Sequence, residues 1–213
     1  MVQLQKLLGG KVIVGEKATV SAFEQQAPFY KIIHLATHGK ANDEVGDYAY
    51  LAFTEVFDSL DNEKLYNRDL YHLNLNADMV VLSACETGIG ELRLGEGIIS
   101  LARGFSYAGA KSIITTLWSV DDETTQKLMT QFYTHLKVGM AKDAALRQAK
   151  IDFLNTNSSL KAHPFYWATF IPIGDTQPIE PPSNFFIWMW GLVLMVVGAL
   201  VFYVWRKKSK VIS

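Results

Sequence analysis

The sequence is poor in cysteine, in net charge and in internal regularity. Cys85 is its single cysteine, which excludes an intrachain disulfide and a zinc site built from several cysteines. With 20 basic and 21 acidic residues, the formal net charge is -1, so no overall field favours nucleic acid or an anionic surface. The chain has no internal repeat and no low-complexity tract. We therefore expect no nucleic-acid partner, no metal and no cofactor.

Long apolar runs are also absent from residues 1–10, where a secretory signal would lie. One such run is present near the other end of the chain. Residues 185–205 contain no Asp, Glu, Lys, Arg or His, and 21 residues in a helix extend roughly 31 Å, which matches a hydrocarbon core of about 30 Å. Aromatic side chains suited to the headgroup boundary flank both ends of the run: Trp188, Trp190, Tyr203 and Trp205. The pattern predicts a single membrane-spanning helix, and the alternative is a buried core helix.

Together with the proline-rich segment before it and the basic segment after it, this run divides the chain into four parts. We expect a folded domain in residues 1–174, a proline-rich linker in residues 175–184, a transmembrane helix in residues 185–205 and a basic tail in residues 206–213. Lys and Arg residues in the tail favour a cytoplasmic C-terminus, because positive charge accumulates on that side of membranes. The side on which the folded domain lies stays open.

Within the folded domain, strand-like runs alternate with helical patterns. This alternation is typical of an α/β domain with a mainly parallel sheet flanked by helices. The predicted strands are short and rich in β-branched or aromatic residues: 11–14, 30–35, 50–53, 79–83, 112–117 and 166–173. The predicted helices and helical turns are 19–26, 68–72, 96–108, 121–136 and 141–153.

Two of these strands lead into side chains that can carry chemistry. The strand at 30–35 runs into His38 and Gly39, and the strand at 79–83 runs into Cys85. Carboxyl ends of parallel strands meet at one edge of a sheet, so neighbouring strands would bring the imidazole and the thiol together. An imidazole beside a thiol favours the thiolate, the nucleophile of cysteine peptidases. The backbone N–H groups of Gly39 and Cys85 are candidate donors to the oxyanion.

Each residue taken alone has a simpler explanation. A single cysteine after a strand is more often a small buried apolar residue than a nucleophile, and a single histidine is usually structural. The glycines between residues 88 and 97 suggest a phosphate-binding loop, but their spacing fits neither common motif. Glu91 and Glu96 would also repel an anion there.

Five sequence blocks occur in a fixed order. They are 34–39 (HLATHG), 80–88 (VVLSACETG), 95–97 (GEG), 117–122 (LWSVDD) and 163–168 (HPFYWA). Together they resemble the CHAT-domain cysteine peptidases of the caspase and separase clan, over about residues 6–174. The resemblance implies a caspase-like fold, His38 and Cys85 as the catalytic dyad, and a structural role for His34.

The same resemblance implies a basis for specificity. Asp122 takes the place of an aspartate that, in separase, is expected to face a basic residue before the cleaved bond. A carboxylate there would pair with a substrate Arg or Lys. The alternative is that Asp121 and Asp122 only cap the helix that begins there, and both roles are compatible.

The resemblance also implies structure beyond this sequence. CHAT domains usually begin with a further strand and helix and commonly follow TPR repeats, so we expect a domain lacking its first strand and helix, downstream of a TPR or other sensor region. We predict a single-pass membrane-anchored cysteine endopeptidase that cleaves a protein partner. The alternative is an inactive membrane-tethered interaction module.

Overall fold

The computed structural model describes residues 2–40, 46–55, 64–83, 96–119, 121–156 and 159–179. The chain divides into two units, Met1–Ile179 and Glu180–Ser213, and the second lies entirely outside the described residues. The expected transmembrane helix and basic tail therefore fall outside them too. Among the helices that are described, none combines the length and the apolar character needed to cross a membrane.

The described part contains seven α-helices and seven strands. The helices are α1 (Val2–Leu8), α2 (Val20–Gln26), α3 (Asn67–Leu70), α4 (Glu96–Tyr107), α5 (Asp122–Lys137), α6 (Lys142–Thr156) and α7 (Pro164–Trp167). The strands are β1 (Ile32–Leu35), β2 (Gly39–Lys40), β3 (Tyr50–Ala52), β4 (Lys64–Tyr66), β5 (Met79–Leu82), β6 (Ser112–Thr116) and β7 (Phe170–Gly174).

A four-stranded sheet in the order β1-β5-β6-β7 forms the centre of the domain. β1, β5 and β6 are parallel to one another, and β7 returns antiparallel to β6. β5 and β6 are buried along their whole length, as the continuous apolar run of β5 predicts for a central parallel strand. The prediction of a mixed α/β domain with a mainly parallel sheet is confirmed.

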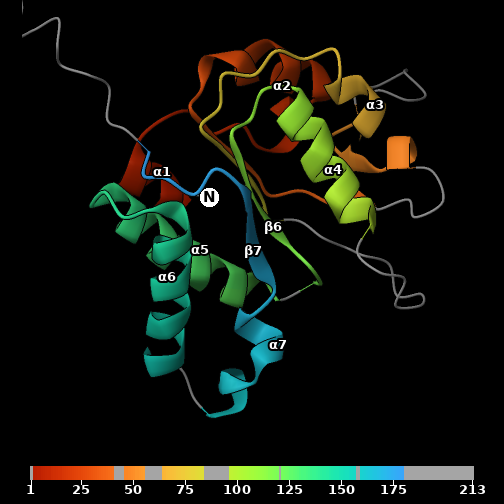
Figure 1. Cartoon of the computed structure of the whole chain (residues 1–213). Helices are drawn as coiled ribbons and strands as arrows, with labels where there is room; N and C mark the ends of the chain where they lie inside the picture. The colour runs from red at the N-terminus through yellow and green to blue at the C-terminus, as the bar shows by residue number, and fades with distance from the viewer. Residues whose placement is uncertain are drawn as a thin grey trace, which may run out of the picture. The chain divides into compact units, whose positions relative to one another are not determined.

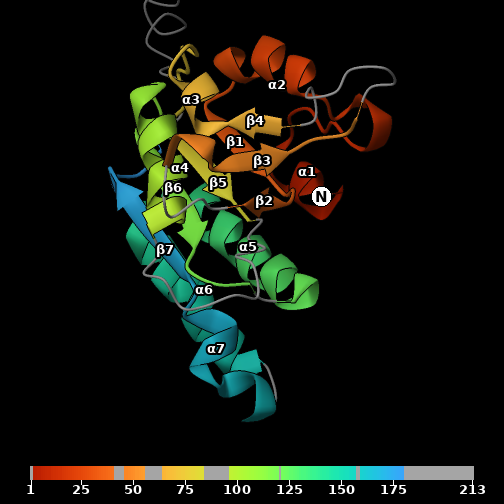
Figure 2. The same cartoon turned by 90° about the vertical axis from the view of Figure 1, so that its right-hand side faces the viewer.

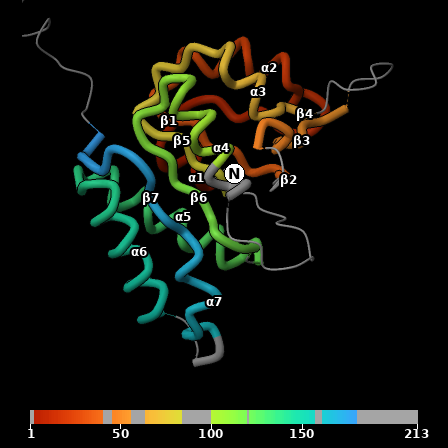
Figure 3. Tube along the Cα trace, turned by 45° about the vertical axis from the view of Figure 1, so that its right-hand side comes forward, coloured from red at the N-terminus to blue at the C-terminus, as the bar shows by residue number. Residues whose placement is uncertain are grey.

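Helices cover both faces of this sheet, and successive strand residues alternate between two cores. Val80 packs with the residues of α2 and α4, whereas Val81 packs with those of α5 and α6. Figure 1 shows α4 on one side of β6 and α5 with α6 on the other. In the trace of Figure 3, α5 and α6 lie side by side, and α6 also lies next to β7.

The region between β1 and β5 is more regular than the sequence suggested. It holds a small antiparallel sheet in the order β2-β3-β4, of which only the strand at 50–53 was predicted. Figure 2 shows its three strands together on the side where α2 and α3 lie. Strands of two or three residues carry too little periodicity to stand out in a sequence.

α2 begins where the sequence predicts a helix, directly after its capping residue Thr19. Thr19 precedes α2 and its Oγ1 accepts a hydrogen bond from the N–H of Ala22 (3.1 Å). His163 and Pro164 begin α7, a short helix that the sequence did not predict and whose second half lies in the predicted strand. The predicted strand at 166–173 is therefore wrong in its first half, and β7 begins only at Phe170.

The predicted strand at 11–14 is wrong as well. These residues form no strand, although Val14 has an extended backbone (φ -141°, ψ 162°). β-branched residues favour extension locally, but a strand also needs a neighbour with which to share hydrogen bonds. α1, just before this segment, was not predicted because its seven residues are too few for a clear helical pattern.

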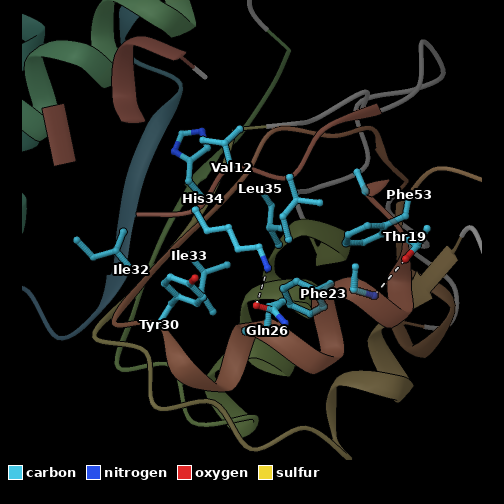
Figure 4. Close-up of a pocket in the computed structure, with 15 residues that line it drawn as sticks. Val12, Thr19, Phe23, Gln26, Tyr30, Ile32, Ile33, His34, Leu35 and Phe53 are labelled. Carbon is cyan, nitrogen blue, oxygen red and sulfur yellow. Dashed lines mark hydrogen bonds between the residues drawn. The ribbon is translucent and has the colours of Figure 1, made fainter. Parts of the chain in front are cut away.

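β1 is an edge strand among the described residues, since it pairs only with β5. A cavity of about 160 Å³ lies beside it, between α2 and residues 11–13 (Figure 4). Phe23 and Phe53 line this cavity, and Lys11 Nζ reaches across to donate to Gln26 Oε1 (2.9 Å). The expectation that a strand is missing from this edge stays a prediction.

Candidate functional site

The two strands that precede His38 and Cys85 are direct neighbours. β1 and β5 pair in parallel, with His34 opposite Val81 and Leu35 opposite Leu82. The pairing continues past both strands, because the N–H of Ser83 donates to the C=O of Leu35 (3.0 Å). The chain therefore leaves β1 and β5 at the same edge of the sheet. Cys85 itself lies outside the described residues, so its position relative to His38 stays a prediction.

The segment that carries His38 is held by the small sheet. The C=O of His38 accepts a hydrogen bond from the N–H of Ala52 (2.7 Å), and the hydroxyl of Thr37 donates to the C=O of Ala52. His38 itself is exposed to solvent. A fixed backbone with an exposed ring suits a residue that meets a substrate.

Gly39 lies in β2 opposite Leu51 of β3. In an antiparallel sheet, hydrogen-bonded and non-hydrogen-bonded residue pairs alternate. His38 and Ala52 form a hydrogen-bonded pair, so the residues of the next pair, Gly39 and Leu51, are not hydrogen-bonded to each other. The N–H of Gly39 therefore points away from β3, toward the side of β2 on which no described strand lies. This direction leaves it suitable as an oxyanion donor.

Asp121 and Asp122 follow the third parallel strand, β6, at the start of α5. Asp121 is the N-cap: its carboxylate accepts hydrogen bonds from the N–H (2.9 Å) and the hydroxyl (2.7 Å) of Thr124. Lys161 Nζ lies 3.7 Å from the same carboxylate. Partial burial alone raises the pKa of Asp121, but the bonds from Thr124 and the charge of Lys161 outweigh it and hold the pKa below its usual value.

Asp122 is the first residue of α5, and its side chain is exposed. The capping role that the sequence assigned jointly to both aspartates therefore belongs to Asp121. Asp121 is exposed as well, but its carboxylate is already engaged by Thr124 and Lys161.

Two of the five sequence blocks meet beside this aspartate pair. The rings of Trp118 and Phe165 stack with their centroids 6.4 Å apart and an interplanar angle of 23°. Trp118 Nε1 also donates to the C=O of Phe165 (2.8 Å), and Thr169 exchanges hydrogen bonds with the backbone of Trp118. The start of α7 is thereby tied to the loop that leads into α5.

Sequence reasoning missed a hydrogen-bonded network behind the strand ends. His34 Nδ1 lies 2.8 Å from the hydroxyl of Tyr133 in α5, and His34 Nε2 lies 2.9 Å from Ser83 Oγ. Burial lowers the pKa of His34 to about 4 and raises that of Tyr133. Tyr133 reads in the sequence as one more apolar residue of α5, and a separation of 99 residues from His34 gives no local signal.

Among the described residues, no three His, Cys, Asp or Glu side chains lie close enough together to hold a metal ion. Cys85, Glu86 and Glu91 lie outside the described residues. The residues that are described thus present an imidazole and a backbone donor after β1 and a carboxylate after β6, the two parallel strands on either side of β5.

Comparison with known proteins shows the family to which the sequence is similar. A family model described as the CHAT domain matches residues 2–175. Tetratricopeptide repeat protein 28 of Mus musculus is 32% identical over 118 residues, and the protein of the same name from Homo sapiens is 31% identical over 118 residues. Each match covers 54% of this chain and 5% of the relative, so the chain corresponds to a small part of those proteins.

Proposed function

The chain belongs to the CHAT-domain family, which is related to the cysteine peptidases, and from this we propose that it is a membrane-anchored cysteine endopeptidase with His38 and Cys85 as its dyad. Support comes above all from the parallel pairing of β1 with β5. That pairing makes the two sequence blocks with His38 and Cys85 leave the sheet at one edge. Without it, the two residues would have no common site.

The proposed reaction is acyl transfer to sulfur followed by hydrolysis. His38 takes the proton of the Cys85 thiol, and the thiolate attacks the peptide carbonyl carbon. The C–N bond breaks as the amine leaves with the proton from His38, and a water molecule, deprotonated by His38, then releases the acyl group and restores the thiol. The N–H of Gly39 and that of Cys85 would stabilise the oxyanion in both steps.

Specificity for a basic residue before the cleaved bond rests on Asp122. Both aspartates are exposed, and Asp121 is already engaged by Thr124 and Lys161, so we propose Asp122 as the partner of the substrate. A carboxylate with a free face forms a charge-assisted pair with Arg or Lys. The stacked rings of Trp118 and Phe165 would provide an apolar surface for the aliphatic part of such a side chain.

Membrane anchoring and an upstream partner region complete the proposal. Anchoring rests on the apolar run at 185–205 and the basic tail at 206–213. A TPR or other sensor region is proposed because the relatives that match are named tetratricopeptide repeat proteins and are far longer than the match.

Active-site labelling tests the peptidase proposal. The full-length chain should react covalently with a peptidyl acyloxymethyl ketone carrying Arg or Lys next to the ketone. Cys85→Ala should abolish labelling and His38→Ala should slow it by about a hundredfold or more, since general base catalysis contributes 10²–10⁴-fold. His72→Ala, which changes another exposed histidine, should label like the wild type. Labelling that persists in Cys85→Ala refutes the assignment.

An inactive membrane-tethered interaction module is the second candidate. The edge position of β1 and the cavity beside it favour this alternative, because an open sheet edge is a surface to which a partner strand can add. If neither labelling nor cleavage occurs in a correctly folded chain, this is the function that remains.

A further inference from the structure

His34 links the two strands of the proposed dyad to the helix behind them. The residue comes from β1, four positions before His38, and its ring contacts Ser83, two positions before Cys85. Its other ring nitrogen contacts Tyr133, the fully buried tyrosine of α5. Figure 4 shows the His34 ring directed away from Phe23, on the face of β1 opposite α2. One imidazole from β1 therefore contacts both the end of β5 and α5, just behind the edge where the dyad is expected.

The hydrogen atoms of this network can be assigned by matching donors to acceptors. Tyr133 is fully buried, and the acceptor that the described residues offer its hydroxyl hydrogen is His34 Nδ1. Nε2 then carries the ring hydrogen and donates it to Ser83 Oγ. The Ser83 hydroxyl in turn donates to the C=O of Leu35 (3.4 Å). Every hydrogen is used, and the chain of bonds runs in one direction from α5 to β1.

The opposite tautomer fits less well. With the hydrogen on Nδ1, His34 would donate to Tyr133, and the buried tyrosine hydroxyl would have no acceptor among the described residues. A buried polar hydrogen without an acceptor is unfavourable. The neutral ring with its hydrogen on Nε2 is therefore the form that the surroundings select.

We propose that His34 is a positioning residue, which, through Ser83 and Tyr133, fixes the carboxyl ends of β1 and β5 relative to each other and so sets the approach of His38 to Cys85. This inference rests on the peptidase function proposed above. His34 does not touch the substrate, because both its ring nitrogens are engaged inside the domain. A displacement of about 1 Å between reacting groups slows a reaction by about a hundredfold, so a bond that fixes two strand ends matters to rate.

Variants of His34 and Tyr133 test the proposal in the full-length chain. His34→Leu and Tyr133→Phe should slow alkylation of Cys85 by iodoacetamide at pH 7 by at least about tenfold. They should also move the apparent pKa of the thiol up toward about 8.5, because a displaced imidazole no longer stabilises the thiolate. His34→Gln should restore most of the rate, since its amide can donate to Ser83 and accept from Tyr133.

Met129→Ala is the matched control. Met129 is buried in the same core as Tyr133, on the same helix, so its truncation destabilises the domain without removing a member of the network. Even if Met129→Ala lowers the thermal stability as much as His34→Leu does, it should keep the wild-type pH profile of Cys85 alkylation. The proposal is overturned if Met129→Ala shifts the profile as His34→Leu does, or if His34→Gln is as impaired as His34→Leu.

Two further outcomes separate this proposal from the peptidase function. A wild-type Cys85 that titrates like an ordinary thiol overturns the peptidase function, and with it the role of His34. A low thiol pKa that survives His34→Leu overturns the role of His34 alone. Imidazole ¹⁵N chemical shifts give a readout independent of reactivity: they should report a neutral His34 with hydrogen on Nε2, and hydrogen on Nδ1 would contradict the network.

Discussion

At the scale of single residues, the domain holds local hydrogen bonds at helix starts and polar contacts between distant elements, such as that of Tyr133 with His34. Thr19 and Asp121 were predicted at helix starts, and both cap a helix through hydrogen bonds to residues three positions on. Tyr133 could not be assigned in the same way, because its partner lies in β1. Local signals predict local bonds, whereas polar contacts between distant elements depend on how those elements pack.

Burial of His34 makes stability depend on pH. Its pKa in the folded chain, about 4, lies below the ordinary value of 6.5, so the unfolded chain binds the proton more tightly. The stabilising effect is complete above pH 6.5 and is lost as the pH falls through 4. At about 1.4 kcal/mol per pH unit, the loss amounts to at most about 3.5 kcal/mol. Urea unfolding at pH 7.5 and pH 4.5 measures it.

His34→Gln is the control for this titration, because the amide does not ionise in this range. The variant should lose clearly less stability than the wild type between the same two pH values. Equal losses in both chains would mean that other groups carry the pH dependence.

Substitutions of the two aspartates at the start of α5 should affect different properties, stability for Asp121 and specificity for Asp122. Asp121→Ala removes the N-cap and should lower the free energy of unfolding by about 1 kcal/mol. Asp122→Ala should change stability by no more than about 0.5 kcal/mol, as at exposed positions generally, and should instead weaken cleavage after Arg and Lys. Thermal unfolding and a peptide-library profile measure the two effects. A reversal, with Asp121→Ala altering specificity and Asp122→Ala altering stability, would contradict this assignment.

At the scale of elements, long periodic or buried segments were predicted and short ones were not. The central strands β5 and β6 and the helices α4, α5 and α6 agree with the predicted ranges to within a few residues. β2 and β4 were missed because strands this short are defined by pairing rather than by pattern. Residues 11–14 show the converse error, a strand-like sequence that has no pairing partner in the described chain.

The edge of β1 that no described strand covers should give an alternating pattern of amide exchange. Lys31 and Leu35 bond to β5 through their carbonyl groups, so the backbone groups of Ile32 and His34 point to the other side. Their amides should exchange with deuterium faster than those of Ile33 and Leu35, by at least about tenfold. Residue-resolved exchange by NMR measures this. Strong protection of Ile32 and His34 would mean that a further strand covers the edge.

At the scale of the whole molecule, alternation of strands and helices predicted a mainly parallel sheet, but not its order or the antiparallel return of β7. Which strands become neighbours depends on packing between segments that are far apart in the sequence, and local sequence patterns do not predict that packing. The common edge of β1, β5 and β6 is therefore the main contribution of the structure to the site. Of the predicted dyad, His38 is described and Cys85 is not.

Membrane anchoring by residues 185–205 predicts how the full-length chain partitions. It should stay with membranes after carbonate extraction. Leu194→Arg places a charge near the centre of the apolar run and should disfavour insertion by about 2.5–3.5 kcal/mol, releasing much of the chain. Ser209→Arg, in the basic tail, should leave it bound. Wild-type chain that is fully released by carbonate would rule out a spanning helix.

A crystal structure of the full-length chain inactivated by a peptidyl ketone tests the dyad most directly. We predict the ketone carbon bonded to Cys85 Sγ, with a ring nitrogen of His38 within about 4 Å of that sulfur, beyond the paired ends of β1 and β5. A Cys85 side chain buried on the face opposite His38, with the inhibitor bonded elsewhere, would contradict the peptidase function.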